Sequence, residues 1–83
     1  MDLNAVFARS IRKIREDNDF TRRQVAQRAQ LSVKYIAKIE QGVHNPRVET
    51  ILKLCKGLKI SPSELFFEIA DLISILEMDK NSE

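Results

Sequence analysis

Apolar residues recur along this chain at spacings of three and four positions, which is the period of an amphipathic helix. One apolar stripe runs from Leu3 to Ile14 and another from Val48 to Leu58, and polar residues fill the positions between. The pattern predicts helices over residues 3–18, 22–29, 33–41, 48–58 and 62–78.

Three of these predicted helices begin with the same local arrangement. An apolar residue precedes a Ser or Thr, and a second apolar residue occupies the fourth helical position, so the pair can form a hydrophobic staple around a capping hydroxyl. Gln24 and Glu64 complete two capping boxes, and Pro62 stands at a first helical position, where its missing N–H costs nothing. The three starts are Phe20-Thr21 before Val25, Leu31-Ser32 before Ile36, and Ile60-Ser61 before Leu65.

The composition agrees with one small all-α domain. The chain has 83 residues, of which 43% are hydrophobic and 31% charged, and it contains two Gly and two Pro. No apolar run approaches the ~18 residues of a membrane span. The N-terminal stretch "MDLNAVFARSIRK" carries charges where a signal peptide needs apolar residues. We therefore expect a cytoplasmic protein.

Residues suited to catalysis or metal binding are scarce. Cys55 is the single cysteine and His44 the single histidine, so the sequence offers no intrachain disulfide and no metal-ligand spacing. It has no paired carboxylates in a plausible cleft, no evident Ser-His-Asp set and too few glycines for a phosphate-binding loop. We expect no enzymatic activity, no cofactor, no metal and no small-molecule ligand.

Charge is distributed unevenly along the chain. Residues 1–59 contain 13 Lys and Arg against 6 Asp and Glu, a net charge of +7. Residues 60–83 contain one Lys against 6 acidic residues, a net charge of −5. The basic part is suited to attract a polyanion if its charge gathers on one face of a recognisable element.

The stretch "LSVKYIAKIEQG" supplies such an element. Only residues 30–32 separate the second predicted helix from the third, and two short helices joined so closely form a helix-turn-helix. An ordinary amphipathic helix with solubilising lysines is the alternative, but the short turn, the two caps and the basic surroundings favour DNA binding. Lysine, glutamine and small apolar side chains match guanine acceptors, adenine and the thymine methyl group, respectively. The predicted solvent-exposed side of this helix carries Val33, Lys34, Ala37, Lys38 and Gln41.

The segment "TRRQVAQRAQLSVKYIAKIEQGVHNPRVETILKLCKGLKISPSELF" resembles the Cro and lambda-repressor type of helix-turn-helix domain, also called XRE-like, and "IRKIRED" extends the match into the first helix. The resemblance implies a compact five-helix, lambda-repressor-like DNA-binding domain. The small size and the ending "SPSELFFEI" are most similar to controller proteins of restriction-modification systems, although small phage repressors share these features.

The resemblance also implies roles for individual residues. Glu40 is expected to form a structural ion pair with Arg15 of the first helix, because an unpaired carboxylate near DNA would oppose binding. A plain loop is the alternative for His44. The expected base contacts are Val33, Lys34 and Lys38 with Ser32 at the groove entrance, and the expected phosphate contacts are Arg22, a half-buried Tyr35, His44 and Asn45.

Two positions depart from the family pattern. Gln30 stands where the family usually has Gly, and it must adopt a left-handed conformation at a cost of about 1 kcal/mol. Arg22 replaces a Gln that can both brace the recognition helix and touch phosphate. Arg22 can still contact a phosphate, but the sequence does not decide whether it also braces the recognition helix.

The fifth predicted helix has more apolar residues than one core needs. Leu65, Ile69, Leu72 and Leu76 form a core stripe, but the apolar sector extends to about 160°, wider than the ~100° typical of a surface helix. Phe67, Ile75 and Met78 lie beyond it. We therefore expect an isologous homodimer, which would set two recognition helices about 34 Å apart on a palindromic operator. Its interface is expected to centre on Phe66, Ala70 and Ile73.

The sequence thus predicts a helix-turn-helix DNA-binding domain over residues 1–79, with a dimerisation helix at about 62–78 and a frayed tail at 80–83. The expected function is sequence-specific regulation of transcription through double-stranded DNA. The alternative is an antitoxin or adaptor whose main partner is another protein and which regulates its own promoter. RNA polymerase is a candidate partner only for an activator, and no motif decides between activation and repression or specifies the operator.

Overall fold

The structure is a computed structural model that describes residues 2–43 and 46–81. Within these residues it contains only helices and turns, so the all-α, five-helix fold predicted from the sequence is confirmed. The helices are α1 (Leu3–Asp17), α2 (Arg22–Ala29), α3 (Val33–Glu40), α4 (Val48–Leu58) and α5 (Pro62–Asn81).

The starts of α2, α3 and α5 lie where the capping residues predict them. The Thr21 hydroxyl accepts the backbone N–H of Gln24 at 3.1 Å, and the Gln24 side chain accepts the N–H of Thr21 at 2.9 Å. Ser61 and Glu64 make the same reciprocal pair, with both distances 3.1 Å. These bonds satisfy N–H groups that a helix start would otherwise leave unpaired.

The end of α5 lies slightly beyond the predicted one. The helix was expected to stop near residue 78 and to be followed by a frayed tail from residue 80, but it continues to Asn81. No Gly or Pro interrupts the sequence after Pro62, so no local signal ends the helix earlier.

A residue with left-handed backbone geometry follows each of the helices α1, α2 and α4. Gln30 has a φ of 57°, as its position required, and Asp19 and Lys59 have φ values of 57° and 59°. The next residue in each case is apolar and turns back onto the helix, as when the Leu31 N–H donates to the Ala26 carbonyl at 2.9 Å. Each connection therefore closes one helix and supplies the apolar staple that precedes the next.

The helix-turn-helix rests on close packing between α2 and α4. Gly57 makes this possible, because a Cβ placed there would lie 2.6 Å from the Val25 carbonyl oxygen of α2. Arg28 of α2 donates to the Gly57 carbonyl at 2.8 Å and stacks over the Phe20 ring at 4.2 Å. The core beneath comprises Ile11, Ile14, Val25, Ala26, Ile36, Ile39, Leu54, Cys55, Leu58 and Leu65.

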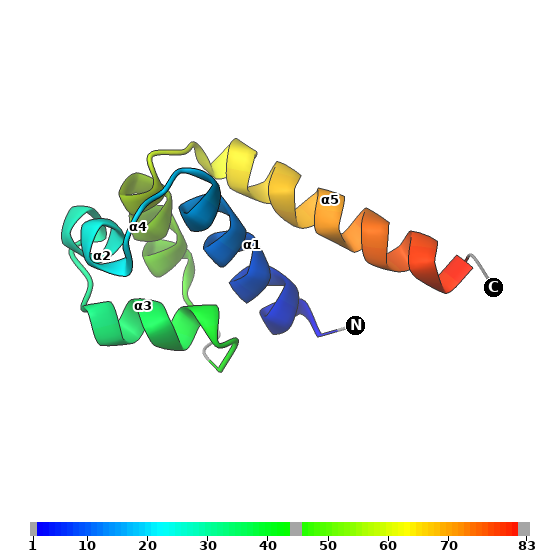
Figure 1. Ribbon diagram of the computed structural model, residues 1–83, viewed down its shortest axis with the longest axis horizontal. Helices are drawn as coiled ribbons and strands as arrows, with labels where there is room; N and C mark the ends of the chain where they lie inside the picture. The colour runs from blue at the N-terminus through cyan, green and yellow to red at the C-terminus, as the bar shows by residue number, and fades with distance from the viewer. Residues whose placement is uncertain (1, 44–45, 82–83) are drawn as a thin grey trace.

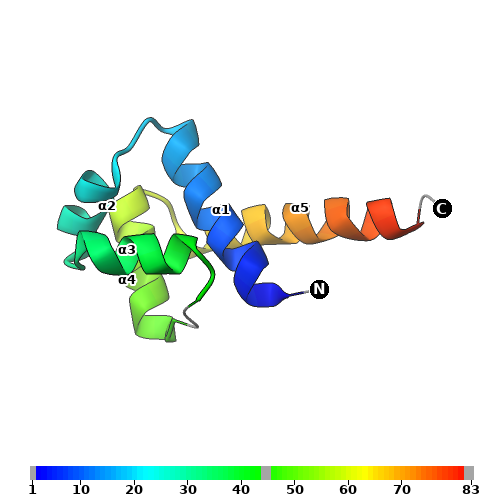
Figure 2. The same cartoon turned by 60° about the horizontal axis from the view of Figure 1, so that its bottom comes forward.

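Helix α5 packs along α1 and then projects past the other helices, away from α2 and α3 (Figures 1 and 2). Within α5, the side chains of Leu65 and Leu72 are buried, whereas that of Leu76 is partly exposed. A salt bridge of 2.8 Å joins Lys13 of α1 to Glu68 of α5. The projection gives the molecule extents of 44 × 22 × 22 Å.

Candidate nucleic-acid interface

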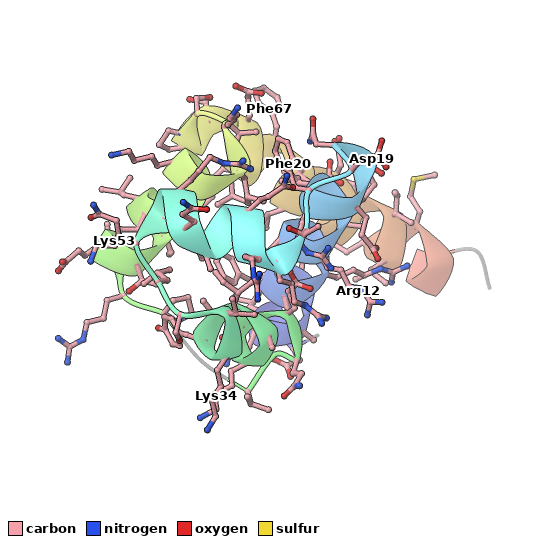
Figure 3. All side chains as sticks on the ribbon, turned by 60° about the vertical axis from the view of Figure 1, so that its left-hand side comes forward. Arg12, Asp19, Phe20, Lys34, Lys53 and Phe67 are labelled. Atoms are coloured by element: carbon pink, nitrogen blue, oxygen red, sulfur yellow. The ribbon has the colours of Figure 1, made fainter. Side chains whose placement is uncertain are left out.

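Helix α3 presents one buried side and one exposed side. Ile36 and Ile39 are 0% and 1% exposed, so they fix the inner side of the helix in the core. The Ser32 hydroxyl accepts the Tyr35 backbone N–H at 3.0 Å and caps the helix start. Four residues expected to contact bases are all exposed: Ser32, Val33, Lys34 and Lys38. Lys34 points away from the body of the molecule (Figure 3).

The carboxylate of Glu40, at the last position of α3, is held inside the protein. Its side chain is 1% exposed and accepts two hydrogen bonds from Arg15, Nε to Oε2 at 2.7 Å and Nη2 to Oε1 at 3.0 Å. This contact raises the pKa of Arg15 above its ordinary value, with the hydrogen bond to Glu40 as the largest cause. The pair joins α1 to the end of α3 and neutralises a charge that would oppose a polyanion.

A second arginine reaches the same carboxylate. Arg22 Nε donates to Glu40 Oε1 at 3.2 Å, so this residue of α2 braces α3, which the sequence had left open. Its side chain remains 42% exposed. A polar cleft of about 670 Å³ opens beside it, and Arg12 and Thr21 also line that cleft.

Of the other residues expected to contact phosphates, the structure describes Tyr35 alone. Tyr35 is partly buried, as its position on the inner arc of α3 suggested. His44 and Asn45 lie outside the described residues. Two further basic residues had not been singled out, Arg23 in the first turn of α2 and Arg47 directly before α4, and both are exposed. The position of Arg23 next to Arg22, and that of Arg47 at the end of the loop after α3, were the signals that could have identified them.

The residues expected to form a dimer interface occupy two neighbouring hollows on α5. Phe66 and Ala70 line an apolar hollow of about 350 Å³ together with Ser63 and Phe67. Ile73 instead lines a groove of about 340 Å³, where it shares the wall with Leu3 and Phe7 of α1. Phe67 is 72% exposed and was not placed at the centre of the interface, although it is the most exposed aromatic residue of the helix. It lies on the outer side of α5 in Figure 3.

The described residues contain no helix long and apolar enough to cross a membrane. Nor do they bring together three His, Cys, Asp or Glu side chains in a metal-binding arrangement.

Comparison with known proteins assigns residues 11–65 to a family described as helix-turn-helix. An uncharacterized HTH-type transcriptional regulator of Mycobacterium tuberculosis is 29% identical over 73 residues, which cover 88% of this chain and 49% of that protein. The chain thus spans about half the length of this relative.

Solved structures show the same fold. The wild-type restriction-modification controller protein C.Esp1396I superposes with a TM-score of 0.83 at 26% identity, covering 88% of this chain and 95% of that one. The clp gene regulator ClgR from Corynebacterium glutamicum gives a TM-score of 0.84 at 22% identity, covering 95% and 84%, and it supports the fold alone. The resemblance to XRE-like domains and to controller proteins is confirmed.

Proposed function

We propose, on the premise that this chain belongs to the helix-turn-helix family, that it binds double-stranded DNA sequence-specifically through α3 and regulates transcription. The observation that carries the proposal is the division of α3 into two sides. Ile36, Ile39 and Glu40 fix the inner side, and the outer side exposes two lysines beside a small apolar patch.

In this proposal the exposed residues of α3 read base edges in the major groove. Lys34 and Lys38 donate to guanine acceptors, and Val33 contacts a thymine methyl group. Ser32 keeps a hydroxyl proton to donate at the groove entrance, because its oxygen serves as acceptor for the helix cap. The phosphate contacts come from Arg22, Tyr35, His44 and Asn45, with Arg23 and Arg47 as additions.

We further propose that the chain acts as a homodimer through α5 on a palindromic operator. Phe66, Phe67 and Ala70 present exposed apolar surface next to the groove that holds Ile73. A second copy related by a two-fold axis would cover this surface and bring a second recognition helix to the other half of the operator. Covering it also removes an apolar patch from water.

The test of DNA reading begins with selection of bound sites from random duplexes, followed by competition with single-base variants of the selected site. Lys34→Ala or Lys38→Ala should lower discrimination at one defined base pair by about 1–3 kcal/mol. Arg23→Ala removes an exposed charge beside the helix and should weaken binding to all duplexes alike. The same pattern for both classes of variant would refute the assignment of α3 as the reading surface.

The test of the dimer uses Ala70→Asp, because Ala70 is exposed in the single chain and can accept a charge without disturbing the core. The variant should sediment as a monomer and bind the operator weakly while it unfolds at the wild-type temperature. Ile73→Asp is less suitable, since Ile73 is already partly buried against α1. A monomeric wild-type protein at micromolar concentration would exclude this dimer.

A further inference from the structure

One row of residues on α5 combines an exposed aromatic side chain with a groove. Five residues at alternating spacings of three and four fall within an arc of about 80° when each residue turns the helix by about 100°. Phe66 in this row is 57% exposed. Ile73, about two helical turns further along, lines the groove of about 340 Å³. The row comprises Ser63, Phe66, Ala70, Ile73 and Glu77.

The groove is shared between α5 and other parts of the chain. Leu3 and Phe7 of α1 line it, as do Pro46, shortly before α4, and Ile51 of α4. Leu3 is 64% exposed, and the groove has room for one phenyl ring. Phe66 of the same chain lines the neighbouring hollow and not this groove. The aromatic side chain and the groove are therefore separate features of one face.

We propose that Phe66 of a second copy fills this groove, and that Phe66 of the first copy fills the groove of the second. The inference rests on the proposed homodimer and deepens it, because it assigns the orientation of the two α5 helices and extends the interface to α1 and α4. The two helices run antiparallel across a two-fold axis at Ala70. Each copy thus supplies a side chain that completes the site of the other.

The order of residues in the row favours this antiparallel arrangement. Phe66 precedes Ala70 by four residues and Ile73 follows it by three, so a two-fold axis at Ala70 brings Phe66 of one copy to Ile73 of the other. In a parallel pair, Phe66 would face its own equivalent and both grooves would stay open. The two Glu77 carboxylates would also meet, and residues 60–78 contain no Lys or Arg to separate their charges.

The first experiment measures the dissociation constant of the dimer by analytical ultracentrifugation of the full chain. Leu3→Asp tests the groove from α1, because Leu3 is exposed in the single chain and an acidic residue is favourable in the first helical turn. The constant should rise by about 30-fold or more, as for the loss of an interface anchor.

Ile75→Asp is the matched control, since it places the same charge on α5 itself. Ile75 is 55% exposed and lies about 180° around the helix from Phe66. This variant should leave the dissociation constant within about twofold of the wild type. Far-UV circular dichroism checks that both variants keep their helices.

A second experiment asks whether Phe66 and Leu3 touch across the interface. Within one chain they line different hollows, so substitutions at the two positions have no shared contact through which to interact. In the dimer, the loss of affinity for Phe66→Ala combined with Leu3→Ala should be smaller than the product of the two single losses by about fivefold or more. Dimers mixed from isotope-labelled and unlabelled copies should show nuclear Overhauser effects between the Phe66 ring and the Leu3 methyl groups of different copies.

Equal effects of Leu3→Asp and Ile75→Asp would overturn the insertion of Phe66 and leave the proposed homodimer intact. Independent losses for Phe66→Ala and Leu3→Ala, without Overhauser effects between copies, would do the same. A wild-type protein that is monomeric at micromolar concentration would overturn both the insertion and the homodimer. Reading of DNA by α3 is tested separately, by the competition with single-base variants.

Discussion

Replacement of Gly57 by Ala tests the packing that positions the helix-turn-helix. An added Cβ would lie 2.6 Å from the Val25 carbonyl oxygen, 2.9 Å from the Ala29 Cβ and 3.1 Å from the Val25 Cγ1. Favourable contacts between heavy atoms lie near 3.5–4.0 Å, so α2 and α4 must separate by several tenths of an ångström or more. The closest neighbour is backbone and cannot rotate away.

The magnitude follows from two opposing terms. Overpacking of a core costs about 1–3 kcal/mol, whereas Ala gains about 1 kcal/mol over Gly in a helix interior. Because a backbone oxygen makes the closest contact, the overpacking cost should fall in the upper part of its range. We expect a net loss of about 1–2 kcal/mol in the free energy of unfolding, or ~4–16 °C in the melting temperature.

Thermal unfolding followed by far-UV circular dichroism measures this loss. Gly42→Ala is the matched control, because a Cβ at Gly42 has its nearest neighbour at 3.6 Å and the cost there comes from a φ of 76°. Asn tolerates this backbone geometry, so Gly42→Asn should lose less stability than Gly42→Ala. Gly57 lies within a helix and has no positive φ, so only packing opposes a side chain there. A Gly57→Ala variant as stable as the wild type would refute the packing argument.

Three further outcomes are expected. Lys59→Gly should raise the free energy of unfolding by about 1 kcal/mol in denaturant titration, because Gly adopts the left-handed φ of 59° without strain; an unchanged midpoint would contradict it. Cys55 is buried and burial raises the pKa of its thiol, so a disulfide reagent should modify Cys55 only after unfolding. The contribution of this raised pKa to the free energy of unfolding should be complete below the pKa of the thiol in the unfolded chain, and it should decline as the pH rises above that value. Affinity for the operator should fall ~10³–10⁵-fold between about 50 and 200 mM salt if a dimer neutralises about 6–10 phosphates, and a flat titration would count against DNA binding.

The helix starts were predictable because their signals are local. A Ser or Thr hydroxyl, a Gln or Glu three residues later and two flanking apolar residues lie within one short segment. The positions of the helix ends near residues 18 and 58 were predicted, but the left-handed geometry of Asp19 and Lys59 after them carried no such local signal. Asp and Lys adopt left-handed geometry there because the following residues, Phe20 and Ile60, pack against the core.

From the residues alone, the candidate site was predictable only where it depends on one helix, and the pair between Arg15 and Glu40, which joins two helices, came from the family resemblance. The outward positions of Lys34 and Lys38 follow from the helical period, whereas the contact between Arg22 and Glu40 depends on how steeply α2 and α3 cross. Ile73 was grouped with Phe66 on a helical wheel. A wheel does not show where α1 lies, and α1 supplies one wall of the groove that Ile73 lines, whereas Phe66 lines a separate hollow.

The projection of α5 also separates the charges of the molecule in space. Residues 60–78 contain four carboxylates and no Lys or Arg, and they extend away from the basic helices α2 and α3 (Figure 1). The acidic helix and the basic helices therefore lie toward different parts of a molecule that is 44 Å long. A polyanion attracts one end of such a molecule and repels the other, so the field applies a torque during diffusion. In the proposed binding of DNA, that torque would turn α3 forward and α5 backward before any contact is made, which would reduce the orientations that must be searched at encounter.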